Sequence, residues 1–186
     1  MTTYKEIRGT NIEAVASDPS NPVEGQVWYN TTTNVVKGVV NNTGTWASGN
    51  NMNTGRSQLA GAGTQTSALA FGGGPGSKNE TEQYNGTNWT EVNNLNSGRA
   101  SLGGSGANNT ACLAFGGFNA ATPQTRADTE LWNGTNWTEV NDLQTARNYL
   151  AGCGTSTAAL GFGGVPNRNE TELWNGTNWT EVNNLN

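Results

Sequence analysis

The feature that most constrains the fold of this chain is a nine-residue motif that occurs three times. The motif is Asn-Gly-Thr-Asn-Trp-Thr-Glu-Val-Asn, and its tryptophans lie 48 and 42 residues apart, at Trp89, Trp137 and Trp179. A shorter copy, Asn-Thr-Gly-Thr-Trp, ends at Trp46, which is 43 residues before Trp89. Self-similarity at such a period is typical of arrays in which each repeat is one supersecondary unit. We therefore expect a repeat protein.

Three further features keep the same register within the repeat. An arginine follows each of the first three tryptophans by ten residues, at Arg56, Arg99 and Arg147. A Phe-Gly-Gly step comes 15 or 16 residues later, at Phe71, Phe115 and Phe162. A Thr-Glu-x-aromatic step then ends at Tyr84, Trp132 and Trp174. The whole unit is thus repeated, and a common fold for the three copies is predicted.

Each repeat is predicted to contain four strands, which in the first copy cover residues 59–63, 68–73, 80–84 and 89–92. The first strand is built almost entirely of Gly and Ala, which suits strands crowded around a central axis. The second is continuously apolar, as a strand buried on both faces should be. Asn85-Gly86 between the last two strands favours a tight turn, because both residues accept positive φ. The pattern predicts an all-β fold.

A Gly-Gly pair after an apolar strand, followed by an aromatic residue and then a tryptophan, resembles the kelch repeat. The resemblance covers residues 46 to 186, and Arg147 in Thr-Ala-Arg matches the arginine that opens the next kelch blade. It implies a β-propeller architecture with three kelch-like four-stranded blades plus a partial blade. Three blades do not easily close a ring, since propellers have about 4–8 of them. We therefore expect a homo-oligomer, an open arc capped by other chains, or a sequence that is part of a longer product.

An extended N-terminal arm and a hairpin precede the repeats, so that the predicted domains are 1–25, 26–49 and 50–186. The stretch Asp18-Pro-Ser-Asn-Pro22 favours turns and extended backbone. The segment Gly-x-x-Trp-Tyr-Asn-Thr-Thr, a second strand and then Trp46 resembles a segment of bacteriophage tail and fibre proteins. This resemblance implies a virion structural protein that contacts other virion proteins. Trp28 and Tyr29, outside the full repeats, are candidate contacts with a partner chain.

Charge and hydropathy exclude two classes of partner. The net charge is −5 and the basic residues form no cluster, so nucleic-acid binding is not expected. No stretch approaches the roughly 20 apolar residues of a membrane span, so membrane insertion is not expected. The N-terminus carries no apolar run like that of a signal peptide. For a viral protein, these features predict synthesis in the host cytoplasm and release by lysis.

The residue types argue against catalysis, and neither a cofactor nor a metal is expected. The chain has no histidine, which excludes Ser–His and Cys–His pairs and the usual copper ligands. Carboxylates two residues apart recur in every repeat: Glu80 and Glu82, Asp128 and Glu130, Glu170 and Glu172. A catalytic pair need occur only once, so we expect these side chains to bond to turns or to arginine. Both cysteines, Cys112 and Cys153, are predicted to be buried and free.

The repeats differ most in the loop after Gly-Gly, and such differences on a rigid scaffold favour a binding role. This loop is longest in the second repeat, where it covers residues 118–126. Its candidate contacts with a ligand or a neighbouring subunit are Phe118, Asn119, Gln124 and Arg126. By contrast, the kelch resemblance implies that Trp89, Trp137 and Trp179 pack between neighbouring blades.

Together these patterns favour a virion structural protein, a bacteriophage tail fibre or other surface appendage. Its kelch-like blades would bind a host-surface glycan or hold the fibre together. The alternative is a cellular kelch-repeat protein that mediates protein–protein interaction. A third hypothesis is a polysaccharide-degrading enzyme that uses the acidic pairs. A nonrepeated carboxylate pair in a cleft would distinguish that enzyme from the two binding proteins.

Overall fold

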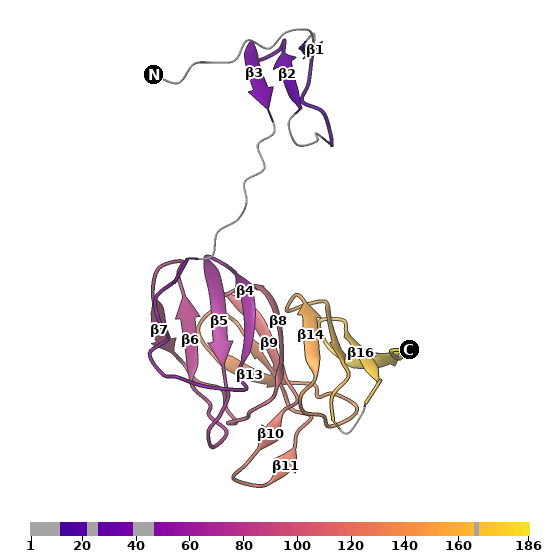
Figure 1. The fold of residues 1–186 in the computed structure, drawn as a ribbon. Helices are drawn as coiled ribbons and strands as arrows, with labels where there is room; N and C mark the ends of the chain where they lie inside the picture. Colours follow the sequence, from indigo (N-terminus) through magenta and orange to yellow (C-terminus); the bar gives the residue numbers. More distant parts are fainter. Residues whose placement is uncertain (1–11, 22–25, 39–46, 166–167) are drawn as a thin grey trace. The chain divides into compact units, whose positions relative to one another are not determined.

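The chain contains two compact units, Met1–Ala47 and Ser48–Asn186. The computed structural model describes residues 12–21, 26–38, 47–165 and 168–186 (Figure 1). Every regular element in these ranges is a β-strand, as expected for an all-β chain rich in Gly, Asn and Thr. The two units are described in turn.

The first unit is a small three-stranded sheet. Strands β2 (Val27–Asn30) and β3 (Val35–Gly38) form the expected antiparallel hairpin, and β1 (Glu13–Val15) pairs with β2 in parallel. Residues 13–15 were expected to belong to an extended arm, because three residues are too few to show the alternation of apolar and polar side chains that indicates a strand. Their partner strand supplies the hydrogen bonds that hold them extended. Trp46, which ends the shorter copy of the motif, lies outside the described residues.

The second unit contains three four-stranded antiparallel sheets, one for each repeat (Figure 1). The first is formed by β4 (Ala60–Thr64), β5 (Ser67–Phe71), β6 (Thr81–Tyr84) and β7 (Trp89–Val92). The second is formed by β8 (Gly103–Asn108), β9 (Ala111–Phe115), β12 (Thr129–Trp132) and β13 (Trp137–Val140). The third is formed by β14 (Ala151–Gly154), β15 (Ala159–Phe162), β16 (Thr171–Trp174) and β17 (Trp179–Val182). The prediction of four strands per repeat is confirmed.

Neighbouring sheets pack through one tryptophan and one phenylalanine. The Trp137 ring of the second sheet lies 5.0 Å from the Phe71 ring of the first, edge to face. Its indole Nε1 donates a hydrogen bond to Thr81 Oγ1 of the first sheet at 3.0 Å. The third sheet repeats this arrangement on the second, as described below for the interface. Trp137 and Trp179 are therefore buried between sheets as predicted, whereas Trp89 is only half-buried.

Small residues allow the inner strands β4, β8 and β14 to approach one another. A Cβ atom at Gly104 would lie 2.8 Å from Phe71 Cζ and 3.1 Å from the Gly61 carbonyl oxygen. At Gly152 it would lie 2.5 Å from Phe115 Cζ. Real Cβ contacts are almost never this short, so glycine is required where a ring and a neighbouring backbone converge.

A buried ion pair ties each sheet to the segment that enters it. Arg99 Nη2 donates to Glu130 Oε1 at 2.8 Å, and both side chains are fully buried. Glu130 Oε2 accepts the backbone N–H of Asn96 at 2.7 Å. Burial lowers the pKa of Arg99, and the Glu130 carboxylate opposes that change. The other two repeats contain the same pair, Arg56 with Glu82 and Arg147 with Glu172. These acidic residues thus bond to arginine and to a turn, as predicted.

The two cysteines differ in burial. Cys112 is buried on β9, and burial raises the pKa of its thiol to about 12. Cys153 on β14 is exposed, so the prediction that it is buried was wrong. Cys153 holds the position of Ser105 on β8, whose hydroxyl donates to the Thr155 carbonyl oxygen of the next sheet at 2.9 Å. The reason for the exposure of Cys153 is therefore that no further sheet of the described residues covers that face of β14.

Candidate binding surface

The three repeats meet at one position that follows each buried arginine by two residues. Gln58, Ser101 and Tyr149 hold this position, with φ values of 54°, 55° and 55°. Their backbones form a chain of hydrogen bonds, from Ser101 N to the Gln58 carbonyl oxygen and from Tyr149 N to the Ser101 carbonyl oxygen, each 2.8 Å. A left-handed backbone is uncommon for residues other than glycine and is frequent where side chains are presented for function.

These residues border a hollow of about 320 Å³, which we call the shared hollow. It is lined by Gln58, Leu59, Ser101, Leu102, Tyr149 and Leu150. The leucines form an apolar floor, and the other three residues supply an amide, a hydroxyl and a phenol. The Tyr149 side chain is 58% exposed, and its hydroxyl accepts a hydrogen bond from Gln58 Nε2 at 2.8 Å. An apolar floor with a few convergent polar groups is typical of a small-ligand site.

Sequence analysis missed the shared hollow, although one signal for it exists. Between the repeated arginine and the repeated leucine, two positions differ in all three repeats, as Ser-Gln, Ala-Ser and Asn-Tyr. Variable positions inside an otherwise repeated segment point to binding rather than packing. Only the packed sheets show that Gln58, Ser101 and Tyr149, at the second of these positions, lie together.

The loops after Gly-Gly lie at the same end of the sheets as the shared hollow. Isolated bridges join Ser57 to Gly74, Ala100 to Phe118 and Asn148 to Val165. Each bridge pairs the residue before the left-handed position with the start of a loop. In the second repeat the loop forms an extra hairpin, β10 (Phe118–Asn119) with β11 (Gln124–Thr125), which extends from the sheets (Figure 1). Each variable loop thus begins beside a residue that directly precedes one of the polar residues of the hollow.

The four candidate residues of this hairpin have different roles. Phe118 is half-buried, and its backbone pairs with Ala100. Asn119 Oδ1 accepts two backbone N–H groups of the turn, at 2.8 and 3.2 Å, so its side chain shapes the loop. Arg126 is bonded to Asp128 at 2.6 and 2.8 Å. Gln124 is exposed, and its side chain forms no hydrogen bond with the described residues, so it is the member most accessible to a ligand.

The two candidates in the first unit also differ. Trp28 is buried, and its indole Nε1 donates to Asp18 Oδ1 at 3.0 Å. Asp18 also accepts hydrogen bonds from Asn30 Nδ2 at 2.7 Å and from Lys37 Nζ at 2.6 Å. These donors lower the pKa of Asp18 to about 2, with Lys37 contributing most. Trp28 is thus engaged within its own unit, whereas Tyr29 is half-buried and its hydroxyl donates to an exposed asparagine.

The other member of each acidic pair forms an ion pair near the surface. Glu80, Asp128 and Glu170 bond to the basic residue two positions earlier, at 3.0, 2.6 and 2.8 Å. In the second repeat the carboxylates of Asp128, Glu139 and Asp142 lie within 4.8 Å of one another. Burial, followed by the two neighbouring aspartates, raises the pKa of Glu139. Asp128 is already bonded to arginine and Asp142 Oδ1 accepts the Thr129 N–H, so this cluster has protein partners.

Comparison with protein-family models and with curated proteins finds no match to this chain. Among the residues that the structure describes, no helix is long and apolar enough to cross a membrane.

Proposed function

We propose that this chain is a non-catalytic binding subunit of a virion appendage, such as a bacteriophage tail fibre, and that it binds a host-surface glycan. In this proposal the three sheets are kelch-like blades, and the shared hollow with the variable loops that begin beside it is the binding face. The shared hollow is the observation that carries the proposal, because it combines an exposed aromatic ring with neutral hydrogen-bonding groups.

The chemistry of the hollow fits a neutral sugar. The C–H face of a pyranose can pack on the exposed Tyr149 ring, because both surfaces are flat and apolar. Its hydroxyl groups can exchange hydrogen bonds with the amide of Gln58 and the hydroxyl of Ser101, which act as both donors and acceptors. None of the residues that line the hollow is charged. An ionic ligand would therefore find no counter-charge there.

The positions of the carboxylates support a binding role over glycoside hydrolysis. Hydrolysis needs two carboxylates that face one substrate. Glu82, Glu130 and Glu172 are instead buried against arginine. The other acidic member of each pair bonds to a neighbouring basic side chain, and none of these residues lines the shared hollow.

The viral part of the proposal is supported by the hairpin of the first unit. The segment that resembles phage tail proteins contains β2 and β3, and Asp18 bonds to both of these strands. A separately folded N-terminal unit suits attachment of a binding module to a larger particle. Antibody labelling of virus particles tests this point, with label expected on the tail or a fibre. Particles that carry no label would contradict the viral assignment and favour a cellular protein that binds other proteins.

Glycan binding is tested with the full chain on an array of neutral oligosaccharides. Tyr149→Ala removes the exposed ring and should weaken binding roughly tenfold or more, as expected for loss of an aromatic anchor. The matched control is Tyr29→Ala, which removes a tyrosine from the other unit and should leave binding unchanged. Equal binding by Tyr149→Ala and the unchanged chain would refute the shared hollow as the site.

A further inference from the structure

We propose that copies of this chain associate head to tail, with the open face of the third sheet packed on the open face of the first sheet of a second copy. The association buries the open faces of the first and third sheets and does not depend on glycan binding. It is inferred from an interface that occurs twice inside the chain and is half-complete at each end of the array.

The two sides of each internal interface carry different residues. The second sheet supplies Gly104 and Trp137, and the Phe71 ring of the first sheet packs against both. The third sheet likewise supplies Gly152 and Trp179 to Phe115, whose ring centroid lies 4.9 Å from that of Trp179.

Each of these contacts is completed by one hydrogen bond. The indole Nε1 of Trp137 donates to Thr81 Oγ1, and that of Trp179 donates to Thr129 Oγ1, both at 3.0 Å. The interface is therefore a phenylalanine and a threonine on one sheet, matched by a glycine and a tryptophan on the next.

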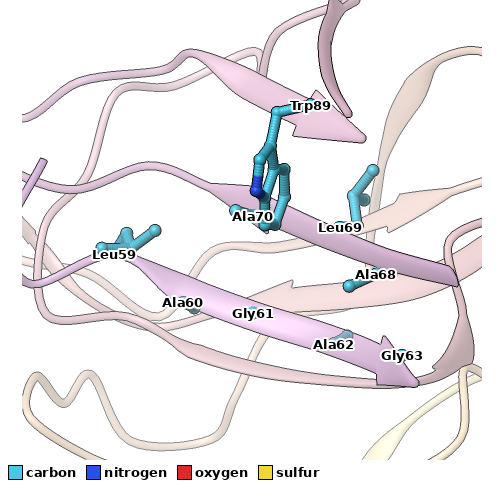
Figure 2. Close-up of a pocket in the computed structure, with 9 residues that line it drawn as sticks. All are labelled: Leu59, Ala60, Gly61, Ala62, Gly63, Ala68, Leu69, Ala70 and Trp89. Carbon is cyan, nitrogen blue, oxygen red and sulfur yellow. The ribbon is translucent and has the colours of Figure 1, made fainter. Parts of the chain in front are cut away.

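On the first sheet, the equivalent glycine and tryptophan are not covered by another sheet of the described residues. A hollow of about 450 Å³ lies over β4 and β5 and is lined by Gly61, Ala70 and Trp89 among others (Figure 2). Gly61 holds the position of Gly104, but a Cβ atom there would meet only the Leu69 carbonyl oxygen, at 3.5 Å. Figure 2 shows the Trp89 ring directed toward β5. We call this surface the open socket.

On the third sheet, the equivalent phenylalanine and threonine have no neighbouring sheet within the described part of the chain. Phe162 is half-buried, whereas Phe71 and Phe115 at the same position are fully buried. Thr171 is 7% exposed, and its Oγ1 is a buried atom with no hydrogen-bond partner among the described residues. A buried, unpaired hydroxyl is costly, and Thr81 at the same position accepts an indole N–H. Trp89 Nε1 of a second copy would satisfy Thr171.

Other residues at the third-sheet face are exposed in the same way. Leu185 is 47% exposed, whereas Leu95 and Leu143 at the same position are 2% and 4% exposed because a following sheet covers them. Cys153 is exposed where Ser105 is buried. The exposed Leu185 and Cys153 and the half-buried Phe162 hold the positions that are covered at the internal interface.

The series of backbone hydrogen bonds that joins Gln58, Ser101 and Tyr149 is also incomplete at both ends. Ser101 N and Tyr149 N each donate to the preceding repeat. Gln58 N has no acceptor and the Tyr149 carbonyl oxygen has no donor within the described residues. The same 2.8 Å bond can therefore form from Gln58 of a second copy to Tyr149. Residues 50–53 and 183–186 both correspond to residues 93–96, so in that assembly only one of the two segments can lie between the sheets and the other must move aside.

The two faces differ, so the contact is heterologous and each copy can use both of its faces.

A complementation experiment on the full chain tests this contact. Gly61→Val places a side chain in the open socket, where the single chain has space for it. Phe162→Ser removes the ring that would enter the socket of the second copy. Sedimentation velocity should show concentration-dependent association of the unchanged chain and monomers for each variant. An equal mixture should form heterodimers, because each variant retains the face that the other lacks.

A threonine pair separates association from folding. Thr171→Val removes an acceptor that has no partner in the isolated chain, so it should weaken association roughly five- to tenfold with little change in unfolding. Thr81→Val, the matched control, removes an acceptor already used by Trp137 and should lower folding stability instead. Labelling of Cys153 by a thiol reagent should slow as the protein concentration rises, and should stay fast in Gly61→Val.

Three results would overturn the proposal. One is that the protein without substitutions remains monomeric up to millimolar concentration. Another is association of Gly61→Val as strong as that of the unchanged chain. The third is a mixture of the two variants that stays monomeric although circular dichroism shows both folded. If Phe162→Ser does not fold, Thr171→Val replaces it, and an unchanged affinity for that variant would count equally against the proposal.

Discussion

Replacing Glu130 with glutamine should destabilise the three-sheet unit strongly. The carboxylate is the counter-ion of Arg99, and both side chains are fully buried. In Glu130→Gln the guanidinium stays buried without a negative partner. The glutamine can also accept from only one of its two former donors, Arg99 Nη2 and Asn96 N, because its amide group is itself a donor.

The size of the effect follows from this burial. Removing one partner of a buried ion pair costs about 3–5 kcal/mol. Folded domains are stable by only about 5–15 kcal/mol, so the loss would be a large fraction of the total. For a unit of this size the melting temperature should fall by about 10–15 °C, at roughly 3 °C for each kcal/mol.

Urea unfolding followed by tryptophan fluorescence and circular dichroism provides the measurement. The matched control is Glu139→Gln, which lies directly opposite Glu130 in the β12–β13 register but is exposed. Burial and then the neighbouring carboxylates of Asp128 and Asp142 raise the pKa of Glu139, so removing its charge should be neutral or slightly stabilising. A loss below about 1 kcal/mol in Glu130→Gln, the range of a surface pair, would refute the reasoning from burial.

Two further predictions concern the first unit and the packing of the sheets. The folded-state pKa of Asp18 is about 2, below the ordinary aspartate value of 3.8, so its stabilisation is present above pH 3.8 and is lost as the pH falls through 2. The NMR signal of the Trp28 indole N–H should shift in that window, and Asp18→Asn should abolish the transition. Gly104→Val should cost about 1–3 kcal/mol because its side chain meets Phe71, whereas Gly61→Val at the matched position should cost little. Equal urea midpoints for the two glycine variants would contradict this account of packing.

The repeat in the sequence determined most of the local structure. Alternating and apolar runs of four to six residues, ended by Asn-Gly or Gly-Gly, specify strands and turns through nearest neighbours alone. In each Asn-Gly turn the asparagine side chain accepts backbone N–H groups two and three residues ahead, as at Asn85 at 2.9 Å. Three copies of one pattern then require three copies of one sheet. The acidic residue that meets the arginine was predictable because both recur in register.

Tertiary structure alone decided which equivalent residues differ in environment. Trp89 and Trp137 lie in identical motifs, yet only Trp137 has a preceding sheet among the described residues to cover it. Cys153 is exposed for the corresponding reason at the other end of the array. Tyr149 reaches the shared hollow because three sheets converge there, and no local pattern encodes that convergence. Burial depends on neighbours that are 40 or more residues away, so a repeat pattern predicts a sheet but not what covers its faces.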